Sequence, residues 1–210
     1  MARNMAREIT VVLIDGYIDD PAALGVPPYI SPMIRSIAGA AKDAGADKVV
    51  YLTIDMIRDG CDIPEAAVTV VLSGNTVPGK YLRSMPMSLK ELDAIFPRLS
   101  GWRLIGGSAA DSPQAERFDF IIKKDLAASL YDGMIGKEVG ERYRTLDEWN
   151  RWMLLGADIV TSHQDFPQPL VVEIETYRGC HRYSVGGCSY CIEAMKGKPL
   201  MRSPSEVLEE

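Results

Sequence analysis

The chain has 210 residues, enough for one well-filled hydrophobic core and part of a second domain. Hydrophobic residues make up 47% and charged residues 25%, and the formal net charge of −6 argues against a general nucleic-acid-binding protein, whose affinity needs clustered lysine and arginine. No apolar run approaches the ~18 residues that a membrane helix needs, and the run at 9–14 is too short for a signal peptide, so we expect a cytoplasmic protein without a membrane partner.

The first part of the chain alternates between apolar strands and capped helices. The continuous apolar run at 8–17 is typical of a strand that is buried on both faces. A helix is predicted over 31–46, with Ser31 as its N-cap, Pro32 at the first helical position and Gly45 as its stop. Further strands are expected at 47–55, 66–74, 102–110 and 117–123, and further helices at 88–99 and 124–136.

This alternation predicts an α/β fold, a Rossmann-like, doubly wound parallel sheet with right-handed crossovers. Ligands of such sheets bind beyond the carboxyl ends of the strands, so the loops after the first, third and fourth strands form the candidate mouth. Asp15, Asp19 and Asp20 follow the first strand, and either a role at this mouth or plain capping and solvation fits them. Lys80 and Arg83 follow the third strand, where they could meet an anion or simply be solvated.

Beyond residue 136 the pattern changes to that of a charged helix. Trp149, Trp152 and Met153 share helical spacing there and are expected in the core. A linker with two prolines follows, in which His163 is expected to be solvated. Residues 170–177 then alternate between apolar and polar side chains, which predicts a single new strand.

Three of the four cysteines, Cys180, Cys188 and Cys191, lie within twelve residues directly after that strand. In a cytosolic chain such a group indicates a metal site rather than disulfides, and thiolates select zinc, copper(I) or iron–sulfur clusters. A structural zinc site needs four protein ligands, whereas three cysteines can hold three corners of a [4Fe–4S] cube and leave one iron open. Cys61 is remote from the others and is expected to be a plain thiol.

The stretch GCHRYSVGGCSYC at 179–191 resembles the signature of the radical S-adenosylmethionine enzymes, in which three cysteines follow the first strand of a partial (β/α)6 barrel. Cys188, Tyr190 and Cys191 match its C-x-aromatic-C half, and a strand that ends in Arg-Gly precedes Cys180. The first spacing is seven residues instead of three. The longer phrase at 173–193 looks like an archaeal branch of that superfamily.

The resemblance implies that Cys180, Cys188 and Cys191 each bind one iron of a [4Fe–4S] cluster. The fourth iron would bind S-adenosylmethionine, and Tyr190 would pack beside its adenine. An electron donor such as ferredoxin or flavodoxin would reduce the cluster, and cleavage of S-adenosylmethionine would give a 5′-deoxyadenosyl radical that acts on a substrate which the sequence does not identify.

The upstream region resembles the Rossmann-like, cobalamin-binding-type domain that precedes the barrel in many of these enzymes. The D-x-H-x-x-G motif that supplies a histidine to cobalt is absent, because the only two histidines are His163 and His181. Cobalamin, if bound, would therefore lack that ligand. The remaining barrel strands would lie beyond Glu210, so the resemblance implies a fragment or a naturally split enzyme that is inactive alone. Its unpaired strand at 170–177 is expected to be poorly ordered or to pair, including with a second copy.

We therefore expect a Rossmann-like domain at 1–145, a helix and linker at 146–169, and the incomplete start of a radical S-adenosylmethionine domain at 170–210. The alternative is a non-catalytic Rossmann-like module that binds a ligand or partner and carries a zinc-stapled tail. In that case His181 is the only nearby fourth ligand, although a place on the loop surface is expected for it. Metal content separates the two readings.

Overall fold

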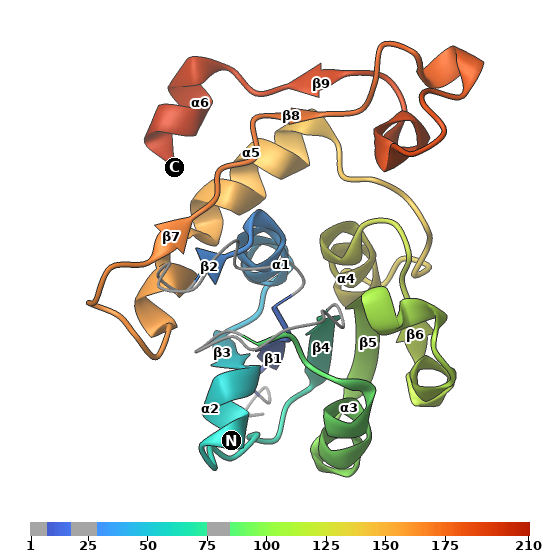
Figure 1. The fold of residues 1–210 in the computed structure, drawn as a ribbon. Helices are drawn as coiled ribbons and strands as arrows, with labels where there is room; N and C mark the ends of the chain where they lie inside the picture. The colour runs from blue at the N-terminus through green and yellow to red at the C-terminus, as the bar shows by residue number, and fades with distance from the viewer. Residues whose placement is uncertain (1–7, 18–28, 75–84) are drawn as a thin grey trace, which may run out of the picture.

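The computed structural model describes residues 8–17, 29–74 and 85–210. Its centre is a five-stranded sheet in the order β3-β1-β4-β5-β6, and every neighbouring pair of strands runs parallel (Figure 1). The strands are β1 (Thr10–Asp15), β3 (Lys48–Thr53), β4 (Val68–Ser73), β5 (Trp102–Gly107) and β6 (Phe120–Ile121). The predicted α/β fold with a doubly wound parallel sheet is confirmed.

Helices cover both faces of this sheet. On β1, Val11 and Leu13 point to one face, Val12 and Ile14 point to the other, and all four are fully buried, as the continuous apolar run predicts. One face is covered by α1 (Pro32–Asp43) and α4 (Leu126–Met134), and the other by α2 (Ile54–Arg58) and α3 (Leu89–Ile95).

The helix starts follow the predicted caps. Ser31 Oγ accepts a hydrogen bond from the Met33 N–H at 3.1 Å, and Pro32 opens α1. Ser88 and Glu91 form the predicted capping box of α3, in which each side chain accepts from the backbone N–H of the other residue. Local sequence therefore fixes where these helices begin.

A further helix, α5 (Leu146–Leu155), crosses α1 with almost no space between the two backbones. A Cβ added to Gly39 would lie 1.8 Å from the Trp152 carbonyl oxygen. One added to Gly156 would lie 1.9 Å from the Arg35 carbonyl oxygen. The two glycines therefore make this close crossing possible.

The side chains of α5 complete the core on the outer side of α1. Trp149, Trp152 and Met153 have no exposed surface, which confirms the prediction made from their spacing. The helix begins at Leu146, because Thr145 caps it through a capping box.

The C-terminal segment, residues 170–210, differs from the single strand expected at 170–177. It contains β7 (Val171–Val172), β8 (Tyr177–Arg178), β9 (Leu200–Met201) and α6 (Pro204–Glu209). β7 pairs in parallel with β2 (Tyr29–Ile30), and β8 pairs antiparallel with β9. Between β7 and β8, the carbonyls of Glu173 and Glu175 accept hydrogen bonds from arginine side chains, so the ladder is interrupted. The segment thus finds its pairing within the chain, away from the five-stranded sheet.

The domain boundaries expected at 145 and 169 stay a prediction. Helix α5 lies beyond the first boundary, yet its Trp152 belongs to the same hydrophobic cluster as α1 and the sheet. In the part of the chain that the structure describes, no helix has the length and apolar character needed to cross a bilayer.

Candidate functional site

Residues 179–197, here called the cysteine loop, connect the paired strands β8 and β9. The Cys180 N–H donates to the Gly197 carbonyl at 3.1 Å, which joins the two ends of the loop. Gly186 and Gly187 have φ values of 84° and 72°, a region that favours glycine. They allow the backbone to turn tightly between Cys180 and Cys188.

Arg182 contacts two of the three cysteines. Its backbone N–H lies 3.3 Å from Cys180 Sγ, and its Nη1 lies 3.6 Å from Cys188 Sγ. The Cys191 N–H donates to the Cys188 carbonyl at 3.1 Å. Within residues 8–17, 29–74 and 85–210, no three His, Cys, Asp or Glu side chains already stand in a metal-binding group. Metal ligation by Cys180, Cys188 and Cys191 therefore stays a prediction.

Tyr190 and His181 lie on the surface of the cysteine loop, whereas Cys61 lies elsewhere. Tyr190 is 88% exposed, so its place beside an adenine stays a prediction. His181 is exposed, as expected. Cys61 packs, partly buried, against the hydrophobic cluster between the sheet and the α2–α3 layer. It belongs to a different part of the fold from the cysteine loop.

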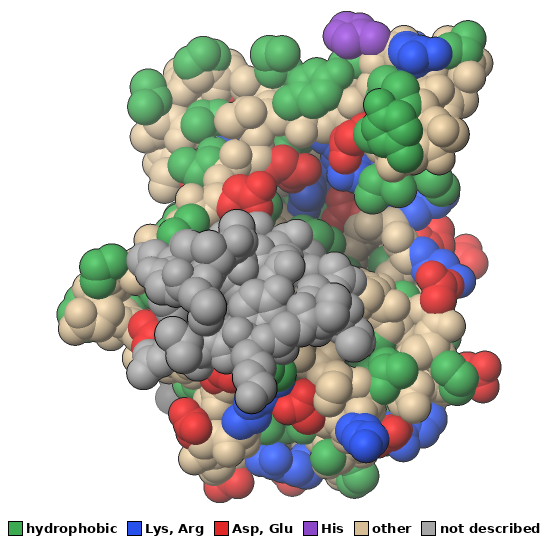
Figure 2. Space-filling model, in the orientation of Figure 1, with side chains coloured by type: hydrophobic (Ala, Val, Ile, Leu, Met, Phe, Trp, Pro, Cys, Tyr) green, Lys and Arg blue, Asp and Glu red, His purple; other side chains and the backbone are tan. Residues whose placement is uncertain are grey.

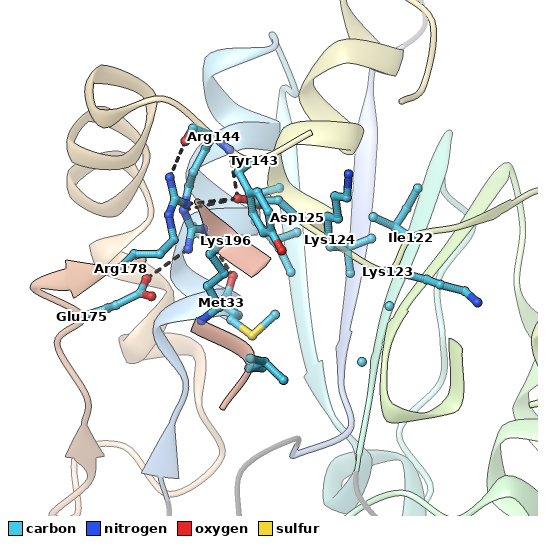
Figure 3. A pocket seen from close by; sticks show the side chains of 17 residues that line it. Met33, Ile122, Lys123, Lys124, Asp125, Tyr143, Arg144, Glu175, Arg178 and Lys196 are labelled. Carbon is cyan, nitrogen blue, oxygen red and sulfur yellow. Dashed lines mark hydrogen bonds and ion pairs between the residues drawn. The ribbon is translucent and has the colours of Figure 1, made fainter. Parts of the chain in front are cut away.

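A pocket of about 300 Å³ lies between the cysteine loop and the carboxyl edge of the sheet (Figure 3). Gly106 and Gly107 line it from the end of β5, and Ile122 follows β6. Arg178 and Lys196 line it from the C-terminal segment. In Figure 2, acidic and basic side chains gather in the recess between this segment, at the top, and the sheet below. The pocket occupies the edge at which doubly wound sheets bind ligands.

The other loops of the predicted mouth are only partly described. Asp15 is 1% exposed at the end of β1, where its carboxylate accepts hydrogen bonds from the Tyr17 N–H (2.9 Å) and the Tyr51 hydroxyl (2.8 Å). It therefore has interior partners instead of the solvated position considered for it. Asp19, Asp20, Lys80 and Arg83 lie outside the described residues.

Sequence reasoning missed four buried arginines that join the C-terminal segment to the rest of the protein. They are Arg35 (2% exposed), Arg144 (6%), Arg178 (3%) and Arg202 (3%). The last three surround the Trp149 ring, with each guanidinium carbon 5.1–5.8 Å from the ring centre. The available signal was weak: Arg35 stands within the apolar stripe of its helix, and the others follow no periodic pattern.

Polar contacts of these arginines cross between the two parts. Arg144 Nη2 lies 3.1 Å from Glu175 Oε2, and Arg202 Nε donates to Asn150 Oδ1 at 2.8 Å. Burial, with Arg202 nearby, lowers the pKa of Arg35 to about 10, so the group stays charged at neutral pH. The contacts place the cysteine loop against the sheet edge by charge-assisted hydrogen bonds.

The expectation that His163 is solvated is wrong. The side chain is buried at 3% exposure, with its ring centre 6.3 Å from that of Tyr51, because the segment after α5 folds back onto the sheet. Its Nδ1 accepts a hydrogen bond from the Asp165 N–H at 3.1 Å. Burial lowers the pKa of His163 below its usual 6.5, against the opposing effect of Asp165 and Asp55.

A pH dependence of stability follows from this burial. The unfolded chain binds a proton at His163 more tightly than the folded chain, so stability is fully present above pH 6.5 and should fall as the pH drops below it. We predict that urea midpoints fall between about pH 7.5 and 5.5, and that His163→Gln flattens this dependence. A variant with the same pH slope as the wild type would contradict the assignment.

The comparison with curated proteins places two relatives beside this chain, and no protein-family model matches it. It is 37% identical over 221 residues to the uncharacterized protein MJ0274 of Methanocaldococcus jannaschii, which covers 95% of this chain and 40% of that protein. It is 34% identical over 207 residues to an uncharacterized protein of Archaeoglobus fulgidus, with 94% and 36% covered. The chain spans about two fifths of the length of these relatives.

Among solved structures, the chain is similar to the cobalamin-dependent S-adenosylmethionine radical enzyme OxsB with aqua-cobalamin bound. The TM-score is 0.54 at 17% identity, over 88% of this chain and 28% of OxsB. The chain shares its fold with that enzyme. A second OxsB structure, with aqua-cobalamin and S-adenosylmethionine bound, gives a TM-score of 0.54 at 16% identity, with the same coverage. The Rossmann-like fold expected for this chain thus has a cobalamin-binding neighbour.

Proposed function

We propose that this chain carries the cluster-binding loop and the Rossmann-like domain of a radical S-adenosylmethionine enzyme. One observation carries the proposal: three cysteines stand in a single closed loop whose end lines a pocket at the carboxyl edge of a parallel sheet. The fold shared with OxsB supports it. The proposal includes the reaction, which is reductive cleavage of S-adenosylmethionine to a 5′-deoxyadenosyl radical that acts on a substrate. It also includes the electron donor, a ferredoxin or flavodoxin.

The cysteine loop fits a [4Fe–4S] cluster better than a structural zinc ion. It offers three thiol sulfurs, and the N–H groups of Arg182 already point at two of them. Such donors stabilise sulfur that carries negative charge. Among the described residues no three such side chains already stand in a metal-binding group, so the preference over zinc rests on the number of cysteines: a structural zinc ion takes four protein ligands, and this loop supplies three thiols. When bound, the cluster would supply the electron that cleaves S-adenosylmethionine.

In this proposal the chain's own residues hold and orient the reacting groups. Cys180, Cys188 and Cys191 bind three irons, and the exposed ring of Tyr190 is available to stack on adenine. Lys196 ends the short helix that follows Cys191 and also lines the pocket. A molecule in the pocket would therefore lie beside the cysteine loop and the end of the sheet.

Cobalamin fits the described residues less well than the cluster does. No histidine is among the described residues that line the pocket, because His163 is buried beside Tyr51 and His181 lies on the loop surface. We therefore propose that cobalamin, where it binds, does so without a histidine from these residues.

Anaerobic reconstitution tests the cluster directly. With iron and sulfide, the chain should bind about four of each and absorb near ~400 nm. Cys180→Ala, Cys188→Ala and Cys191→Ala should each abolish that absorbance because every cysteine holds one iron. Cys61→Ala is the matched control and should keep it, since Cys61 packs in the other layer of the fold. A chain that instead binds one zinc, lost in His181→Ala, would rule the proposal out.

Self-association through the C-terminal segment also remains a proposal. The strands β7 and β8 are each paired within the chain. We propose that a second copy contacts the exposed apolar side chains of the cysteine loop, among them Val185 and Met195 (72% and 78% exposed). Light scattering after gel filtration would show a concentration-dependent dimer that Val185→Asp weakens. A strictly monomeric chain at all concentrations would exclude it.

A further inference from the structure

The pocket between the cysteine loop and the sheet edge is cationic, although the whole chain has a net charge of −6. The charged residues that line it are the cations Lys123, Lys124, Arg144, Arg178 and Lys196 and the carboxylates Asp125 and Glu175. Lys123 and Lys196 have partners outside the lining, in Asp111 and Glu193. The Lys123–Asp111 pair is exposed and the Lys196–Glu193 pair is partly exposed. Inside the pocket, five cations face only two carboxylates.

Arg178 is the buried cation of this pocket. Its Nη2 donates to the Arg144 carbonyl at 2.5 Å, but its Nε and Nη1 are buried without a hydrogen-bond acceptor among the described residues. The nearest carboxylate oxygen, Asp125 Oδ2, lies 3.5 Å from Arg178 Nη1 and also 3.5 Å from Arg144 Nε. One carboxylate is thus shared by two guanidinium groups. Buried donors without acceptors are costly, so the site is incomplete as it stands.

We propose that this pocket binds the anionic group of a small molecule, a phosphate or a carboxylate, with Arg178 as its buried contact. An oxyanion offers the acceptors that Nε and Nη1 lack, and a guanidinium group binds such anions in a fixed planar geometry. Two aromatic rings lie close to this guanidinium group, with the ring centres of Trp149 and Tyr143 at 5.1 Å and 5.5 Å from its carbon. Figure 3 shows Arg178, Tyr143 and Lys124 around the same space.

The backbone around the pocket suits an anion as well. Helix α4 begins at Leu126, and Leu126 lines the pocket. The positive end of this nine-residue helix therefore borders the pocket. At the end of β5, Gly107 has a φ of 86° and no side chain to fill the space. A volume of about 300 Å³ is at the small end for ligand pockets and accommodates an anionic group with a few further atoms.

Calorimetry on the 210-residue chain, without iron or sulfide, tests the site with pyrophosphate and malonate as probes. We expect saturable binding of at least one probe to one site per chain. Arg178→Gln should weaken it by at least about tenfold, since a hydrogen bond to a charged group is lost. Asp125→Asn should tighten it, because the competing carboxylate is removed while asparagine still caps α4. Lys90→Ala, an exposed lysine on α3, should leave the affinity unchanged.

Because Arg178 is buried, Arg178→Gln could disturb the fold. Its affinity is therefore compared with that of the wild type after circular dichroism has shown that the two have the same fold. Lys124→Ala, at an exposed position on the pocket lining, provides a second variant and should weaken binding several-fold. Tighter binding of pyrophosphate identifies a phosphate ligand, and tighter binding of malonate a carboxylate ligand. Absence of saturable binding, or equal affinity in Lys124→Ala and wild type, overturns the inference. The experiment needs no cluster, so its failure would leave the iron–sulfur proposal standing.

Discussion

Gly39→Ala is expected to destabilise the fold by about 3 kcal/mol or more, a large part of the roughly 5–15 kcal/mol that holds an ordinary domain together. The new methyl group would lie 1.8 Å from the Trp152 carbonyl oxygen and 2.5 Å from the carbonyl carbon. Both are backbone atoms, so no side-chain rotation relieves the overlap, and α1 and α5 must move apart. Urea unfolding followed by tryptophan fluorescence measures the loss.

Gly140→Ala is the matched control for this substitution. Its Cβ would meet only the Glu138 carbonyl oxygen, at 3.9 Å, which is an ordinary contact. Its stability should stay within about 0.5 kcal/mol of the wild type. If Gly39→Ala unfolds at the same urea concentration as Gly140→Ala, then α1 and α5 do not cross as described.

Trp149→Ala is expected to cost about 3–5 kcal/mol, the range for truncating a fully buried tryptophan. The ring packs against three guanidinium groups, of Arg144, Arg178 and Arg202, so its removal leaves three buried cations around a cavity. Because these arginines also hold the C-terminal segment, amide hydrogens of residues 170–202 should exchange faster in this variant. Mass spectrometry of the exchanged peptides locates the effect.

The variant Trp149→Phe distinguishes the contribution of the aromatic ring to stability from that of the indole N–H group. Trp149 Nε1 is buried without a hydrogen-bond partner among the described residues, so phenylalanine keeps an aromatic face and removes an unsatisfied donor. We expect a loss of only about 1–2 kcal/mol, from the smaller volume. Equal losses for alanine and phenylalanine, or unchanged exchange at residues 170–202 in Trp149→Ala, would contradict the role given to the ring.

The sheet and its helices could be predicted because their signals are local. Residues 11–14 are apolar on both faces of one strand, and the Ser88–Glu91 pair carries its own cap geometry within four residues. The same holds for Trp149 and Trp152, whose spacing alone indicates a buried face. Such features need no knowledge of what packs against them.

The C-terminal segment could not be predicted in the same way, because its structure depends on distant partners. The alternation at 170–177 indicates one strand, but Arg35, far away in the sequence, donates to the Glu173 carbonyl and interrupts it. His163 looks solvated in its linker and becomes buried only when that linker lies against Tyr51. The three cysteines were found by spacing, whereas the pocket beside them is lined from several separate stretches of chain and has no sequence pattern.

The arginine contacts have a consequence for how the cysteine loop can move. Apolar side chains tolerate sliding past one another, but hydrogen bonds from guanidinium groups are directional and are lost after a shift of about 1 Å. Arg144, Arg178 and Arg202 share one ring and neighbouring acceptors, so displacing one disturbs the others. We therefore expect these contacts to be lost together if the loop leaves the sheet edge, rather than one at a time. An anion that accepts hydrogen bonds from Arg178 would therefore stabilise the arrangement in which the loop lies against the sheet edge.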